Sequence, residues 1–129
     1  MLGPQLSIVI PTFREADNLP VLIPQLDAAT AAAGITCEIL VVDDDSRDGT
    51  IETCAELARR HPVNLLTRVD ERGLSSAVLA GFRIARGDVV IVMDADLSHP
   101  PDKVPELYAA LQQPHTDFVI GSRYVAGGG

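Results

Sequence analysis

Two apolar runs in this chain each stop at a group of aspartates, and this pattern limits the possible folds more than any other feature. Residues 39–42 (Ile-Leu-Val-Val) lead into three aspartates at 43–45, and residues 89–93 (Val-Val-Ile-Val-Met) lead into Asp-Ala-Asp at 94–96. Runs of β-branched residues that are separated by helical patterns predict interior strands of a parallel sheet. Ligands of such sheets bind in the crevice at the carboxyl ends of the strands. We therefore expect both aspartate groups to face one pocket.

The rest of the chain continues the same alternation of strand and helix. Further short apolar segments predict strands at 6–10, 63–67 and 118–121. Apolar residues at helical spacing predict helices at 19–33, 50–61, 72–86 and 102–111. This order predicts an α/β fold: a mostly parallel, twisted sheet with helices on both faces and right-handed crossovers.

Individual residues set expectations for the ends and inner faces of these elements. Pro11 is expected to stop the first strand. Either Asn18 or Asp17 is expected to cap the first helix, and Asp102 the last one. In the helix at 72–86, the side chains expected to face the core are Leu74, Val78, Leu79 and Phe82.

Composition limits the classes of protein to consider. A chain of 129 residues suffices for one core, so we expect a single domain over 1–129. The net charge of -8 argues against nucleic acid as a partner, and an anionic substrate would need a cation. Cys37 and Cys54 lack zinc or redox spacing and are expected to be reduced core residues of a cytosolic chain. Residues 1–5 lack the charged and apolar regions of a signal peptide, and no apolar stretch approaches the about 20 residues that span a membrane, so we expect no membrane-spanning segment in this sequence.

Asp94 and Asp96 are the sharpest candidates for metal ligands. Alternate residues of an extended segment point to the same side, so both carboxylates can reach one ion. Two carboxylate oxygens, completed by substrate phosphate and water, suit Mg²⁺ or Mn²⁺. The alternative interpretation is an Asp-rich turn before the prolines at 100–101.

Asp43 and Asp44 are candidates for binding a nucleoside. A carboxylate at this edge of a sheet can accept hydrogen bonds from a nucleobase N–H or a ribose hydroxyl. In the alternative interpretation, the segment is a polar loop in which Asp48 or Ser46 caps the next helix. Capping accounts for one of these residues, but it does not account for three consecutive aspartates after a buried strand.

Three further residues are secondary candidates. Arg72 and Arg123 lie near predicted strand or loop ends, where a guanidinium can clamp a diphosphate. Each is equally compatible with a surface ion pair of little energetic consequence. His99 is a candidate metal ligand or phosphate contact, although a single histidine beside two prolines is more often an ordinary loop residue.

Four segments together resemble a known family. They are residues 8–19, 41–50, 72–74 and 93–100. In this order and spacing the chain resembles the family-2 glycosyltransferases of GT-A type, and most closely the dolichol- or polyprenyl-phosphate mannose synthases. The resemblance implies the Rossmann-like, nucleotide-binding half of the GT-A fold. It also implies that the chain is the N-terminal, donor-binding part of such an enzyme and is incomplete at its C-terminus.

The resemblance implies metal-dependent transfer of a sugar, mannose from GDP-mannose in the closest branch, to a dolichyl or polyprenyl phosphate, with inversion at the anomeric carbon. The implied nucleoside contacts are Pro11, Thr12, Glu15, Asp43 and Asp44. The implied ligands of Mg²⁺ or Mn²⁺ are Asp94 and Asp96, with Ser98 at a position where some relatives have a further metal contact. The implied phosphate contact is Arg123.

Other functions remain open at this point. The chain is alternatively a nucleotide-binding fragment without catalysis, or a family-2 enzyme that uses a UDP-sugar. A lipid phosphate acceptor implies a cytoplasmic location at the face of a membrane, with peripheral contact through a region beyond residue 129. Acceptor recognition is expected to need that region as well.

Overall fold

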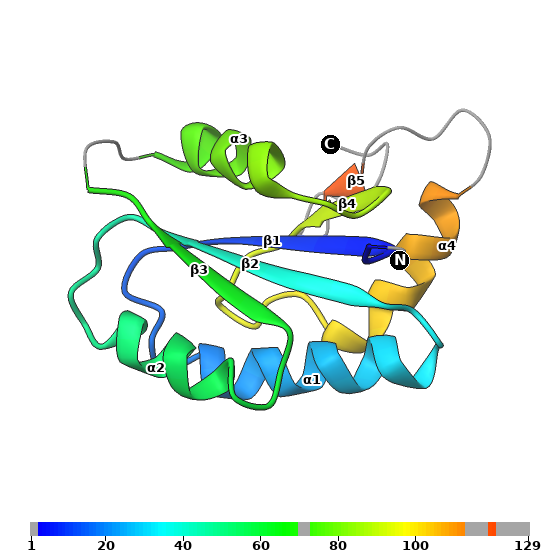
Figure 1. Cartoon of the computed structure of the whole chain (residues 1–129), viewed down its shortest axis with the longest axis horizontal. Helices are drawn as coiled ribbons and strands as arrows, with labels where there is room; N and C mark the ends of the chain where they lie inside the picture. The colour runs from blue at the N-terminus through cyan, green and yellow to red at the C-terminus, as the bar shows by residue number, and fades with distance from the viewer. Residues whose placement is uncertain (1–2, 70–72, 113–118, 121–129) are drawn as a thin grey trace.

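The computed structural model describes residues 3–69, 73–112 and 119–120 and contains one five-stranded sheet (Figure 1). The strand order is β3-β2-β1-β4-β5, and every neighbouring pair is parallel. The strands are β1 (Leu6–Thr12), β2 (Cys37–Asp43), β3 (Val63–Thr67), β4 (Val89–Val92) and β5 (Val119–Ile120). The helices are α1 (Leu19–Ala32), α2 (Thr50–Leu57), α3 (Leu74–Ile84), the 3₁₀ turn η1 (Pro101–Lys103) and α4 (Val104–Leu111). The predicted α/β fold is confirmed.

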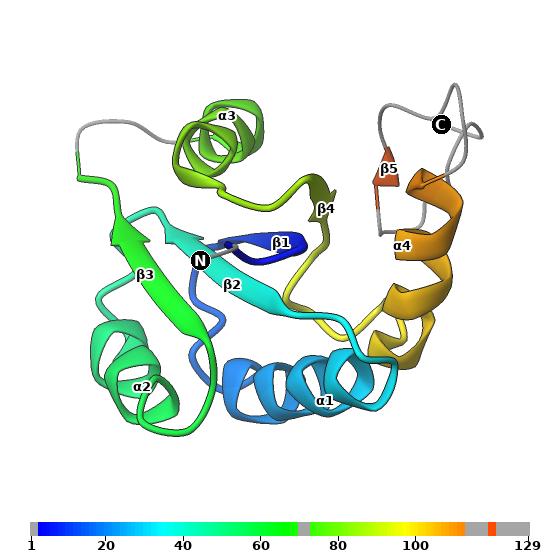
Figure 2. The same cartoon turned by 45° about the vertical axis from the view of Figure 1, so that its right-hand side comes forward.

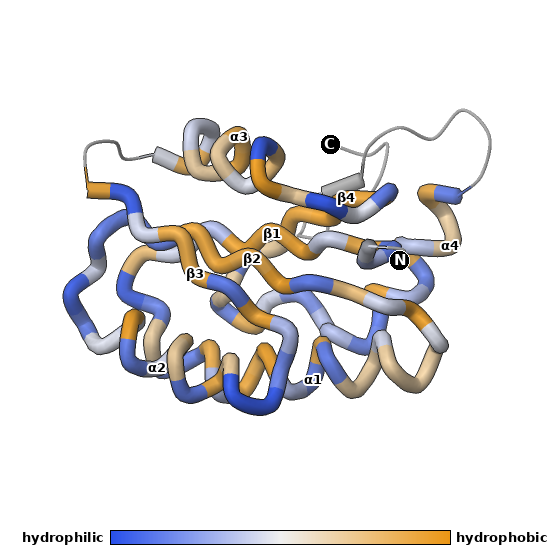
Figure 3. The backbone as a smooth tube through the Cα atoms, in the orientation of Figure 1, coloured by the Kyte–Doolittle hydropathy of each residue, from blue (hydrophilic) through white to orange (hydrophobic). Residues whose placement is uncertain are grey.

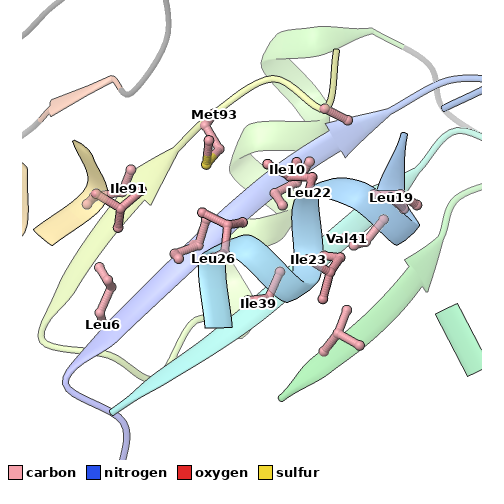
Figure 4. Close-up of a cluster of buried hydrophobic side chains, with 14 of the residues drawn as sticks. Leu6, Ile10, Leu19, Leu22, Ile23, Leu26, Ile39, Val41, Ile91 and Met93 are labelled. Atoms are coloured by element: carbon pink, nitrogen blue, oxygen red, sulfur yellow. The ribbon is translucent and has the colours of Figure 1, made fainter. Parts of the chain in front are cut away.

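Helices cover both faces of the sheet, as predicted. Figure 2 shows α3 alone on one face and α1, α2 and α4 on the other. The strands carry the most apolar stretches of the backbone, at the centre of the molecule (Figure 3). The larger core cluster lies between α1 and the sheet, with Leu22, Ile23 and Leu26 of α1 over Ile10 and Ile39 (Figure 4). Within the described residues, no helix is long and apolar enough to span a bilayer.

The first strand differs from the prediction, because β1 continues through Pro11 to Thr12. The last paired residues of β1 and β4 are Val9 and Val92. The Met93 N–H donates to the Val9 carbonyl, so odd-numbered residues of β1 face β4. Pro11 would therefore direct its N–H toward β4, but β4 has already ended there, and the missing donor breaks no ladder hydrogen bond.

The inner face of α3 agrees with the prediction only in part, because Val78 and Phe82 pack against the core cluster on that face but Leu74 and Leu79 do not. Its buried residues are Ala77 and Gly81, whereas Leu74 and Leu79 are exposed. A Cβ atom on Gly81 would lie 2.4 Å from Cγ1 of Val9. The helix therefore lies too close to β1 for large side chains, and the larger apolar residues of α3 pack beside the contact or face solvent.

The predicted helix caps are largely wrong. Asn18 does occupy the N-cap position of α1, but its side chain makes no cap bond and instead donates from Nδ2 to Glu15. Asp102 lies inside η1, and α4 begins after Lys103. Asp48 does accept hydrogen bonds from the N–H and hydroxyl of Thr50, the first residue of α2, although the capping position is Gly49, whose φ of 93° favours glycine.

Both cysteines are free thiols. Cys54 is buried in the core, as predicted, and Cys37 is half-buried. Burial, together with the nearby charge of Asp43, raises the pKa of the Cys54 thiol to about 11. Cys54 is therefore protonated at neutral pH and unreactive.

A buried carboxylate fixes the turn before β4, at the opposite edge of the sheet from the aspartates. Glu38 Oε2 accepts hydrogen bonds of 2.6 Å from the Ser7 hydroxyl and from the Arg86 N–H. Arg86 Nε lies 3.2 Å from Glu38 Oε1, and the Ser7 hydroxyl accepts from the Gly87 N–H. Burial opposes the charge of Glu38, but these hydrogen bonds outweigh it and hold the pKa of Glu38 below its ordinary value.

We expect this network to make stability depend on pH. Because the folded pKa of Glu38 is the lower one, its contribution is present above the unfolded pKa and is lost as pH falls through the folded pKa. The variant Glu38→Gln should lose about 1 kcal/mol of stability at pH 7, since charge-assisted bonds become neutral ones. Urea unfolding from pH 7 to pH 3 tests this, and a deficit that does not shrink toward low pH would contradict it.

Candidate functional site

A pocket of about 520 Å³ opens at the carboxyl edge of the sheet, between β1 and β4. The strand order reverses between these two strands, and ligands of α/β sheets bind at such a switch point. β1 runs on past its last pair with β4, which opens the crevice. The lining residues are Pro11, Thr12, Phe13, Glu15, Asp44, Gly73, Leu74, Ala77, Asp94, Ala95 and Asp96.

The structure brings most of the sequence-predicted site residues together in this pocket. Those that line it are Pro11, Thr12, Glu15, Asp44, Asp94 and Asp96. Asp43, Ser98 and His99 do not line it. Arg72 and Arg123 lie outside the described residues.

Asp43 lies behind the pocket wall and is almost completely buried. Its Oδ1 accepts a hydrogen bond of 2.7 Å from the hydroxyl of Thr12, which does line the pocket. The same carboxylate accepts the N–H and hydroxyl of Ser46, and the Ser46 hydroxyl accepts the N–H of Arg14. Asp43 thus joins the loop after β1 to the loop after β2 and fixes the Thr12 side chain.

Asp44 is held by an arginine that the sequence analysis did not single out. Both Nε and Nη2 of Arg68 lie within hydrogen-bond distance of Asp44 Oδ1, at 2.9 and 2.8 Å. Oδ2 of Asp44 accepts the Gly73 N–H at 3.0 Å, and Arg68 Nη2 donates to the Gly73 carbonyl. Arg68 and Asp44 therefore bind both backbone polar groups of Gly73, which lines the pocket. The one feature of the sequence that pointed to Arg68 is its position directly after β3, at the same edge of the sheet as the aspartates.

Asp94 and Asp96 flank Ala95 on the β4 side of the pocket. The Asp96 Oδ1 atom accepts the N–H of Ser98 at 3.0 Å. No three acidic, histidine or cysteine side chains in the described part of the chain are arranged to bind a metal. In the same loop, the buried Nε2 atom of His99 has no hydrogen-bond partner.

The pocket is strongly acidic. Asp44 is paired with Arg68, and Glu15, Asp94 and Asp96 add three further carboxylates to the lining. Like charges in one site disfavour each other's ionised forms, and a bound cation removes that cost. Carboxylate oxygens are ligands that Mg²⁺ and Mn²⁺ prefer, so this pocket suits an anionic ligand that arrives with a divalent metal.

Comparison with known proteins gives a consistent result. Residues 7–129 match the model of the family described as glycosyl transferase family 2. Over 124 residues the chain is 49% identical to the dolichol-phosphate mannosyltransferase of Pyrococcus furiosus, covering 96% of this chain and 34% of the relative. Over 129 residues it is 46% identical to the dolichol-phosphate mannosyltransferase of Mycosarcoma maydis, covering 96% of this chain and 44% of the relative.

A solved structure shares the fold. It is a mannosyltransferase from Pyrobaculum calidifontis in complex with GDP-Man and Mn²⁺, with a TM-score of 0.70 and 27% identity. The match covers 88% of this chain and 34% of that one. The chain thus spans between about a third and a half of the length of these similar proteins.

Proposed function

This chain belongs to glycosyl transferase family 2, and from that membership we propose that its pocket binds GDP-mannose with a divalent metal. The protein transfers the mannose to a dolichyl or polyprenyl phosphate. The observation that carries the proposal is the pocket at the β1–β4 switch point, where Asp44 and the Asp94–Asp96 pair meet. The names of two similar proteins, each at least 46% identical, support mannose transfer to this acceptor, and the mannosyltransferase from Pyrobaculum calidifontis, solved with GDP-Man and Mn²⁺, supports the donor and the metal.

The residues present fit a divalent cation. Asp94 and Asp96 would hold Mg²⁺ or Mn²⁺, with Ser98 as a further candidate contact, and the donor diphosphate and water would complete the shell. The buried, unpartnered Nε2 of His99 leaves one more nitrogen in this loop that a ligand or water can satisfy. Held by these residues, a divalent metal would supply Lewis-acid stabilisation of the charge that develops on the diphosphate leaving group.

The remaining pocket residues would bind the nucleoside. Pro11, Thr12 and Glu15 line the β1 side, and Asp44 offers a carboxylate that Arg68 keeps in place. Asp43 contributes through Thr12, whose hydroxyl it holds. Arg72 and Arg123 are proposed to contact phosphate.

The chemistry requires no acid or base from the protein. A phosphate acceptor is already anionic near neutral pH, and the diphosphate departs without needing a proton. An oxygen of the acceptor phosphate attacks the anomeric carbon from the face opposite the diphosphate, which leaves. The reaction passes through an oxocarbenium-like state and inverts the anomeric carbon. A lipid acceptor places the reaction at a membrane, for which we propose the cytoplasmic face and peripheral contact.

Transfer of radiolabelled mannose from GDP-mannose to dolichyl phosphate in vesicles tests the proposal. Because the similar proteins are more than twice as long, we expect the 129-residue chain to bind the donor but to transfer little mannose. A chimera that continues after residue 129 with the corresponding sequence of the Pyrococcus furiosus relative should transfer it. A chimera that binds GDP-mannose yet transfers none would contradict the proposed reaction and favour nucleotide binding without catalysis.

A further inference from the structure

The backbone at the carboxyl edge of the sheet adopts a conformation that L-residues rarely take. Among the described residues, the non-glycine positions with positive φ are Arg14, Asp45, Arg47 and Leu97. All of them lie in the loops that follow β1, β2 and β4, at the edge that carries the pocket. Aspartate tolerates the left-handed region, whereas a bulky apolar residue there is uncommon. Leu97 is therefore the position that most needs an explanation.

Leu97 is the central residue of a tight turn beside the pocket. Its φ is 66°, and it separates Asp96 from Ser98, whose N–H donates to Asp96 Oδ1 at 3.0 Å. Leu97 is 38% exposed and is not part of either buried core cluster, so core packing does not account for the strained backbone. Unfavourable backbone conformations persist where the surrounding structure requires them, and they cluster at ligand sites.

We propose that Leu97 is a positioning residue for the metal site. Its left-handed backbone closes the turn that brings the Ser98 N–H onto the Asp96 carboxylate, and this bond orients the carboxylate that lines the pocket. Leu97 acts through its backbone, and its side chain contributes nothing to metal binding. The inference rests on the proposed function, since it concerns the cation that Asp96 would bind.

Substitutions at residue 97 separate the backbone from the side chain. Valine, being β-branched, fits poorly at positive φ and should open the turn, whereas glycine and asparagine accept that region readily. We expect Leu97→Val to weaken Mn²⁺ binding by about tenfold or more, the loss typical when the support of a metal ligand is removed. Leu97→Gly and Leu97→Asn should stay within about threefold of the unaltered chain, because both can keep the turn.

Electron paramagnetic resonance of free Mn²⁺ in the presence of GDP measures these affinities without requiring sugar transfer. Leu79→Val is the matched control, because Leu79 is an exposed leucine on α3 away from the pocket lining. Thermal unfolding without metal shows whether each variant is folded. An unchanged affinity in Leu97→Val, or an equal loss in Leu97→Gly, would overturn the inference. If the unaltered chain does not bind Mn²⁺, both the inference about Leu97 and the metal part of the proposed function are overturned.

Discussion

Replacing Asp96 by asparagine is expected to weaken Mn²⁺-dependent binding of GDP by at least about tenfold, as for loss of a metal ligand or its support. The side chain keeps its size and can still accept the Ser98 N–H through its amide oxygen, so the turn should survive. What is lost is one negative charge and one strong ligand for a hard cation. Calorimetric titration of GDP in the presence of Mn²⁺ measures the effect.

The matched control for this substitution is Asp102→Asn. It removes the same charge from an exposed residue of η1, which does not line the pocket. We expect the control to bind GDP and Mn²⁺ as the unaltered chain does. An Asp96→Asn variant that binds GDP and Mn²⁺ as tightly as the unaltered chain would remove Asp96 from the metal site. Equal losses in both variants would reduce its role to general electrostatics.

Replacing Arg68 by methionine is expected to destabilise the fold by about 3 kcal/mol, because an almost buried carboxylate is left without its partner. The exposed fractions of the Arg68 and Asp44 side chains are only 9% and 11%, so water cannot readily take the place of the guanidinium. The change should also weaken GDP binding, since Asp44 and Gly73 both line the pocket. Urea unfolding and calorimetry measure the two effects separately.

Two variants sharpen this test. Arg59→Met removes an arginine from an exposed ion pair with Glu56 and should cost less than about 0.5 kcal/mol. Adding Asp44→Asn to Arg68→Met removes the unpaired charge and should restore part of the stability, but it should not restore GDP binding. A single Arg68→Met variant as stable as Arg59→Met would show that the pair does not hold the pocket wall.

The arrangement of the sheet could be predicted from the sequence because it follows from local patterns. Apolar runs such as 39–42 and 89–93 identify buried parallel strands, and parallel strands place their carboxyl ends at one edge. The meeting of Asp44, Asp94 and Asp96 in one pocket follows from that geometry. These expectations needed no knowledge of individual side-chain contacts.

Other features of the site and the fold depend on tertiary contacts, which local sequence patterns do not predict. The burial of Asp43 behind Thr12 depends on how the two loops pack, and the same pattern of aspartates would fit an exposed carboxylate. Arg68 was missed because its role arises from contacts with residues up to 24 positions away. On α3, Val78 and Phe82 pack inward as predicted, but Leu74 and Leu79 do not, because the close approach of Gly81 to Val9 leaves no room for leucine.

The central claim is that the pocket between β1 and β4 binds a nucleotide-sugar through a divalent metal. Isothermal titration of the 129-residue chain with GDP-mannose, with Mn²⁺ and again with the metal removed by a chelator, tests it most directly. The account predicts saturable binding that needs Mn²⁺ and that is stronger than the binding of UDP-glucose or UDP-GlcNAc under the same conditions. Absence of binding, or binding of equal strength with and without Mn²⁺, would contradict it.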